Sequence, residues 1–163
     1  MGKTGEGAKA GAAAGLIYGI LEAVFILVFM TVFRSTIVSI LTKSIPPGAS
    51  ISPGALYSLT VSLAVAVAFV GGIIVGLILG LIFSAVYGHL PGKSGMAKGA
   101  FFGIVMWLIF NVLLGLGNIR FGLAFYGLGV VSGLIAALIF GLIMGTLYER
   151  WTKSMFPEGT VKS

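Results

Sequence analysis

The sequence contains no cysteine and no aspartate, and it has only four glutamates and a single histidine, His89. The absence of cysteine excludes disulfide bonds, thiol nucleophiles and cysteine-ligated metals. Metal sites and acid–base catalysis draw on clusters of His, Cys, Asp and Glu side chains, and this chain cannot assemble such a cluster alone. We therefore expect a protein that is not an enzyme, with no metal site and no cofactor.

Charged residues are also scarce. They make up 9% of the chain, whereas hydrophobic residues make up 58%. A soluble domain has about a quarter of its residues charged, and a disordered chain is far less apolar. Both classes are excluded, which leaves an integral membrane protein.

Long apolar runs predict an all-α protein with four transmembrane helices, since about 20 residues cross a bilayer core. The first run is longer than the 7–15 residues of a signal-peptide core, so we expect a retained helix. The short apolar stretch 36–41 cannot cross and predicts an interfacial or re-entrant piece. The four spans are expected at about 10–33, 63–87, 99–117 and 121–147.

The connections differ in length and charge. Segment 34–54 contains three prolines and predicts an extended outer loop, while 91–98 is a basic loop and 152–163 a polar tail. One side of the membrane would hold seven basic residues: Lys3, Lys9, Lys93, Lys98, Arg150, Lys153 and Lys162. The other side would hold three: Arg34, Lys43 and Arg120. The positive-inside rule then places both termini in the cytoplasm. The net charge of +6 is explained by topology and anionic headgroups, so no nucleic-acid partner is expected.

The two halves of the chain, 1–90 and 99–151, resemble each other. A shift of 61 positions brings the second span onto the fourth, with eight identical residues over positions 71–87. A shift of 88 brings four small residues near the start of the third span onto small residues of the first. This pattern predicts a duplicated two-helix unit, with the repeats parallel because each unit has two spans.

Small residues recur every fourth position in all four runs. Residues four apart share one helix face, and a stripe of glycine allows two backbones to approach closely in the absence of a hydrophobic driving force. The stripes predict Gly-xxx-Gly packing within the chain, or contact with a second copy or with larger subunits. The expected packing residues are Gly11, Gly15, Gly19, Gly72, Gly76, Gly80, Gly99, Gly103, Gly133, Gly141 and Gly145.

Few polar side chains are expected inside the membrane. Glu22 lies in the first span, within roughly 20° of the glycine stripe on a helical projection. Glu22 is a proton or cation site, a partner for a cationic group on another subunit, or a structural acid bonded to Tyr18 or to a carbonyl. The duplication also predicts a contact between Glu22 and Asn111. Tyr87 and Tyr148 are expected in an aromatic belt at the cytoplasmic interface.

Two interpretations of function follow. The first is a non-catalytic helix bundle that serves as a structural or accessory subunit of a membrane complex. The second is a small channel or transporter for protons or cations that uses Glu22 and Asn111. The size, four spans and glycine-rich helices also resemble the proteolipids of rotary ATPases. That family carries its essential carboxylate on the second helix of a hairpin, whereas Glu22 lies on a first helix, so we set this resemblance aside.

Overall fold

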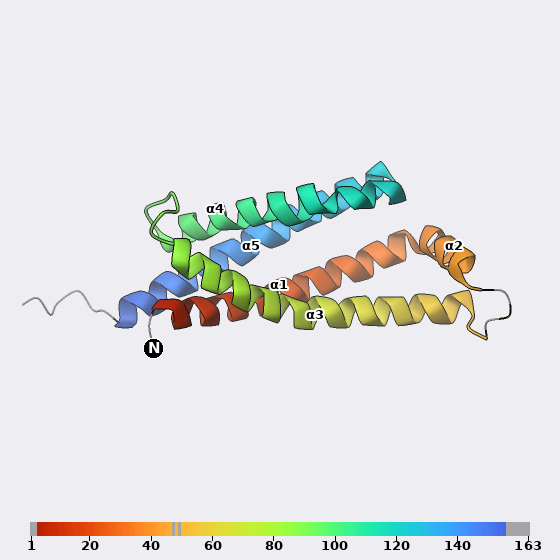
Figure 1. Ribbon diagram of the computed structural model, residues 1–163, viewed down its shortest axis with the longest axis horizontal. Coiled ribbons are helices and arrows are strands. Elements are labelled where there is room, and N and C mark those ends of the chain that lie inside the picture. The colour runs from red at the N-terminus through yellow and green to blue at the C-terminus, as the bar shows by residue number, and fades with distance from the viewer. Residues whose placement is uncertain (1–2, 47, 49, 156–163) are drawn as a thin grey trace, which may run out of the picture.

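The computed structural model describes residues 3–46, 48 and 50–155, which form helices joined by short connections (Figure 1). The expectation of an all-helical chain with four apolar spans is confirmed. A helix satisfies its backbone polar groups internally, which is why an apolar run crosses a bilayer in this form. Within these described residues, four helices are long and apolar enough to cross a membrane: Thr4–Val32, Pro53–Val86, Gly95–Ile119 and Leu123–Ser154.

Three of these spans are continuous α-helices: α1 over Lys3–Val32, α3 over Pro53–Val86 and α5 over Leu123–Met155. Helix α3 begins ten residues before the expected start at 63. The Ser52 hydroxyl accepts a hydrogen bond from the Ala55 amide at 3.2 Å, and Pro53 lies in the first turn, where its missing N–H costs nothing. These features explain the early start of the helix.

The outer connection differs from its prediction. Residues Arg34–Ser44 form a helix, α2, rather than an extended loop. All three prolines of the segment follow α2, so none of them interrupts its hydrogen bonds. The expectation of an extended 34–54 is therefore wrong for its first half.

The third span changes its winding part-way along. It begins as α-helix α4 over Gly95–Trp107, continues as π-helix η1 over Leu108–Leu113, and ends as 3-10 helix η2 over Leu114–Phe121. Gly122, at φ 113°, then turns the chain into α5, and this backbone conformation favours glycine. The apolar run 99–117 predicts a regular helix here, so that expectation is wrong for the second half of the span.

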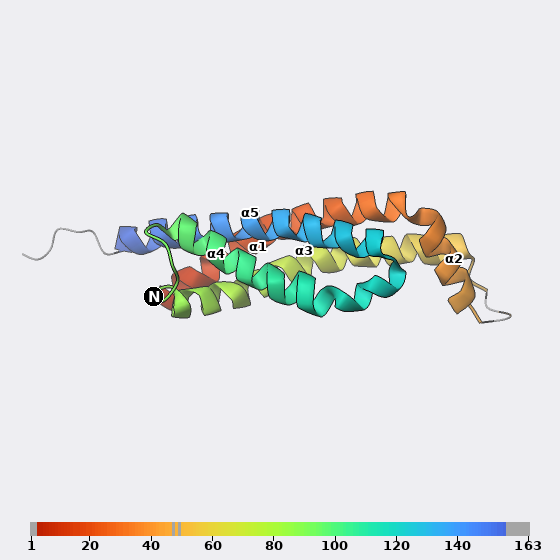
Figure 2. The same ribbon diagram turned by 90° about the horizontal axis from the view of Figure 1, so that it is seen from above.

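The spans pack in the order α3, α1, α5, α4, with α1 against both α3 and α5 (Figures 1 and 2). The start of α1, the connection 87–94 and the end of α5 lie at one end of the bundle. Helix α2 and η2 lie at the opposite end (Figure 2). Helices α3 and α4 stand at the two ends of the packing order.

Glycines bring α1 and α3 into backbone contact. A Cβ atom built on Gly76 would lie 2.7 Å from the Gly15 Cα, and one on Gly11 would lie 2.6 Å from the Gly80 Cα. Real Cβ atoms essentially never approach so closely, so a side chain at these positions would force the helices apart.

Helices α4 and α5 meet in the same way, but in a different register from the sequence alignment. A Cβ atom built on Gly99 would lie 2.9 Å from the Gly145 Cα, just as one built on Gly11 would lie 2.6 Å from the Gly80 Cα. In these contacts, α1 and α4 correspond with the expected shift of 88 residues. Helices α3 and α5 correspond with a shift of 65 residues, which is about one helical turn more than the shift of 61 that aligns their sequences. The duplication itself stays a prediction.

The core is aromatic and lies toward the end that carries the connection 87–94. Phe83 is fully buried, and its ring centroid lies 5.3 Å from that of Phe102 and 5.6 Å from that of Tyr148. Tyr148 is only 2% exposed, so its expected place in an interface belt is wrong. Its ring fills the space between helices because Phe83 and Tyr87 both pack against it.

Candidate functional site: a cavity at Glu22 and Asn111

Glu22 lies one turn beyond Gly19, the last glycine of α1, and its side chain is partly buried. It lines two neighbouring cavities, of about 340 Å³ and about 310 Å³. Phe110 and Asn111 of η1 also line both cavities. The two spaces therefore meet at these three residues, which come from spans far apart in the sequence.

The larger cavity lies between α1, the irregular end of the third span and the first half of α5. Its walls are mostly aromatic and apolar, and its polar side chains include Glu22, Asn111, Asn118 and Ser132. The Phe29 and Phe125 rings, whose centroids are 4.2 Å apart at 74°, join α1 to α5 along its wall.

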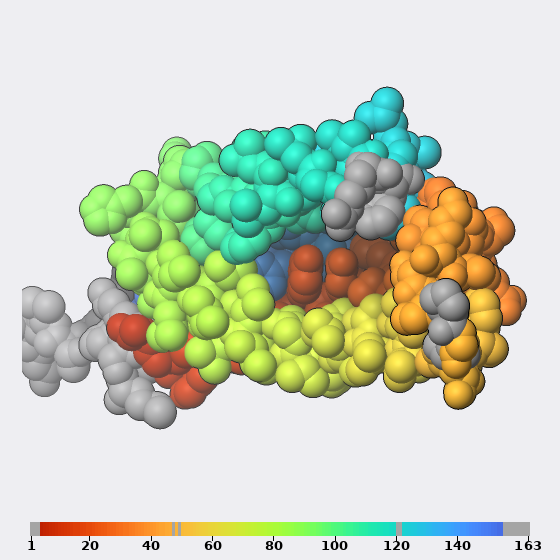
Figure 3. Space-filling view, turned by 45° about the vertical axis from the view of Figure 1, so that its right-hand side comes forward, coloured from red at the N-terminus to blue at the C-terminus, as the bar shows by residue number. Residues whose placement is uncertain are grey.

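The smaller cavity opens between α3 and α4. Figure 3 shows a hollow between these helices, with α1 and α5 at its floor. Its lining includes Tyr18, Gly71, Met106 and Phe140, in addition to the three shared residues. This cavity therefore opens on the outer surface of the helix bundle, between α3 and α4.

Asn111 is positioned by the π-helix and by a glycine. The Tyr126 hydroxyl donates to the Val112 carbonyl at 3.2 Å, which attaches η1 to α5. The Asn111 amide lies directly against Gly133, where any Cβ atom would overlap the amide oxygen. Gly133 therefore leaves room for the Asn111 side chain, whereas Gly141 and Gly145 of α5 lie against the backbone of α4.

The expected polar contacts of Glu22 are not formed. Among the described residues, no hydrogen bond joins Glu22 to Tyr18 or to Asn111, although all three line the smaller cavity. Tyr18 packs edge-on against Phe140 instead, with ring centroids 6.0 Å apart. The Glu22 carboxylate therefore faces the cavities without a hydrogen-bonding partner in the described part of the chain.

A second polar cluster lies at the opposite end of α5, outside the cavities. The Glu149 carboxylate accepts a hydrogen bond from the Gly95 amide at the start of α4 and pairs with Lys153 at 2.8 Å. The Lys98 ammonium donates to the Tyr87 carbonyl and lies 4.3 Å from the Tyr87 ring centroid. Burial, and then the Glu149 carboxylate, raise the pKa of the Tyr87 phenol, which stays neutral. Sequence reasoning missed this cluster, because Glu149 lies 54 residues from Gly95, the amide that it accepts a hydrogen bond from.

A family model described as Family of unknown function (DUF6789) matches residues 6–156. The chain belongs to this family. No curated protein and no solved structure matches it. The matched range contains Glu22, Asn111 and the full lining of both cavities.

The side chains that line the two cavities of this DUF6789 chain can contact a ligand. Within residues 3–46, 48 and 50–155, no three His, Cys, Asp or Glu side chains come together as metal ligands. The cavities instead combine one carboxylate and two amides with aromatic walls. Such a lining suits a ligand that carries positive charge.

Proposed function

We propose that the protein is a non-enzymatic, multi-pass membrane carrier for protons or cations, with Glu22 and Asn111 as its intramembrane binding residues. The observation that carries the proposal is that two cavities from different parts of the bundle meet at these side chains. A carrier needs a polar site that both sides of the membrane can reach in turn.

The cost of Glu22 supports this proposal. A carboxylate near the centre of a span costs roughly 2.5–3.5 kcal/mol on insertion scales. A structural acid recovers such a cost through hydrogen bonds, yet Glu22 makes none to Tyr18 or Asn111 in the described structure. Its oxygens are thus available to a proton or to a cation.

The alternative is a structural or accessory subunit, which docks on larger subunits or on a second copy. Close glycine contacts and the small size of the segments outside the spans favour this role. For either function we place both termini in the cytoplasm, because seven of the ten basic residues belong to that end of the topology.

Ion flux in proteoliposomes tests the carrier. The native protein should release a proton or cation gradient faster than empty liposomes, and Glu22→Gln should abolish the flux, because an amide exchanges no proton and balances no charge. Glu149→Gln, which changes an acid outside the cavities, is the matched control and should retain the flux.

The absence of native flux would refute the carrier. The subunit interpretation would then be tested by identifying what co-purifies from the native membrane in mild detergent. Flux that survives in the folded Glu22→Gln variant would likewise exclude Glu22 as the binding residue.

A further inference from the structure

We infer that the ligand of the two cavities is a monovalent organic cation, an ammonium ion with apolar substituents. This inference rests on the proposed binding role of Glu22 and names the substrate class. Three features of the cavities carry it: the aromatic walls, the single acidic side chain among the described lining residues, and the opening of the smaller cavity between α3 and α4.

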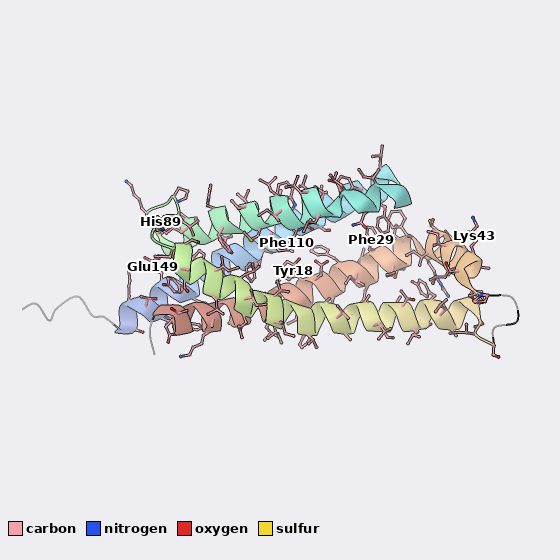
Figure 4. All side chains as sticks on the ribbon, viewed as in Figure 1. Tyr18, Phe29, Lys43, His89, Phe110 and Glu149 are labelled. Atoms are coloured by element: carbon pink, nitrogen blue, oxygen red, sulfur yellow. The ribbon has the colours of Figure 1, made fainter. Side chains whose placement is uncertain are left out.

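The aromatic walls come first. Phe29, Phe110, Phe125 and Tyr126 all line the larger cavity, and they belong to three different elements of the bundle. In Figure 4 the labelled Tyr18, Phe29 and Phe110 lie in the region between the α1–α3 pair and the α4–α5 pair. Aromatic faces attract ammonium ions, and substituted ammonium groups are commonly bound in such aromatic surroundings.

The charge of the lining matches a single positive charge. Among the described residues that line the two cavities, Glu22 is the only acidic one, and the sequence contains no aspartate. Hard metal cations take about six or more oxygen ligands. Besides Glu22, the larger cavity offers the side-chain oxygens of Asn111, Asn118 and Ser132, while the Tyr126 hydroxyl donates to the Val112 carbonyl.

The dimensions and the opening fit an amphipathic ligand. Small-molecule sites typically enclose about 300–1,000 Å³, and the cavities enclose about 340 Å³ and 310 Å³. The ammonium group would lie beside Glu22, where the cavities meet. Its apolar substituents would extend toward the α3–α4 opening, whose lining includes Val67, Val75 and Leu79. Entry from the bilayer follows, because a lipophilic cation already partitions there.

The test measures binding of radiolabelled benzyltrimethylammonium to the purified full chain in detergent by equilibrium dialysis. We expect saturable binding that a hundredfold excess of sodium chloride does not displace. Glu22→Gln should weaken the affinity at least tenfold. Phe110→Leu, which keeps apolar bulk but removes the aromatic face, should weaken it roughly two- to thirtyfold.

Phe101→Leu is the matched control for the aromatic contribution. Phe101 lies on α4, is 43% exposed and belongs to neither cavity, so its replacement should leave the affinity unchanged. Helicity by circular dichroism confirms that each variant is folded. If a variant fails to fold, competition is measured on the native protein instead. Neither an excess of sodium nor the uncharged analogue neopentylbenzene should displace the bound probe.

The outcomes separate this inference from the carrier proposal. No saturable binding, equal displacement by sodium, or equal loss in Phe101→Leu and Phe110→Leu would overturn the organic cation. Proton or inorganic-cation flux would persist in that case if the carrier proposal holds. Saturable binding that depends on Glu22, without any flux, would support the ligand class and refute transport.

Discussion

Gly71 and Gly72 are neighbours in α3, but they meet different surroundings. A Cβ atom built on Gly72 would lie 2.6 Å from the Gly15 carbonyl oxygen and 2.8 Å from the Gly19 Cα. One built on Gly71 would meet nothing within 4 Å. Replacing each glycine by alanine therefore adds the same methyl group with and without a steric conflict.

The magnitude follows from this geometry. Both substitutions replace a mid-helix glycine by a better helix former, so the helix-propensity gain of up to about 1 kcal/mol cancels between them. For Gly72→Ala, α1 and α3 would have to part by about 0.7 Å to restore a carbon contact of about 3.5 Å. The obstacles are backbone atoms that no rotamer change can move. We expect Gly72→Ala to be less stable than Gly71→Ala by about 1–3 kcal/mol, the usual cost of overpacking.

The assay is unfolding in mixed micelles of increasing dodecyl sulfate content, followed by far-ultraviolet circular dichroism. Gly72→Ala should unfold at a lower dodecyl sulfate fraction than the native protein, and Gly71→Ala at an equal or higher one. Identical midpoints for the two variants would refute the reasoning, because they would mean that the α1–α3 backbones do not limit each other's approach.

Three further predictions use the same chain. Gly133→Ala should destabilise the protein by about 1–3 kcal/mol through overlap with the Asn111 amide, and adding Asn111→Ala should relieve most of that loss; additive effects in a double-mutant cycle would contradict the contact. Single cysteines at Ser50 and Ser94 can report topology, since the native chain has none. An impermeant thiol reagent on intact cells should label position 50 and not 94, and the reverse pattern would overturn the orientation. Glu149→Ala should cost about 1–2 kcal/mol by removing the acceptor for the first amide of α4, whereas Glu149→Gln keeps an acceptor and should cost less; equal losses would show that the bond does not matter.

The number of spans was predictable because hydropathy and length act locally. Each apolar run forms a helix whatever its neighbours are, since its backbone has no other way to satisfy its hydrogen bonds in lipid. The prolines of 34–54 predict an extended segment, but all of them follow Ser44, so they leave the residues of α2 free to form a helix. The π-helix was not predictable because the sequence of Leu108–Leu113 carries no proline or glycine that would mark a change of winding.

The candidate site was predictable only in part. Glu22 and Asn111 stand out in the sequence because polar side chains are rare within apolar runs. Their surroundings do not, because the aromatic residues that line the cavities are spread over α1, α4, η1 and α5. Periodicity also placed the glycines on one helix face, but it could not supply the register in which α5 meets α4.

The sequence by itself therefore determined the number of apolar helices and the presence of one carboxylate, Glu22, inside an apolar run, because both follow from the polarity of consecutive residues. Only the tertiary structure decided that Glu22 shares its cavities with Asn111 and Phe110. The reason is that a cavity is the space between helices, and the shape of that space depends on how segments distant in the chain cross and pack.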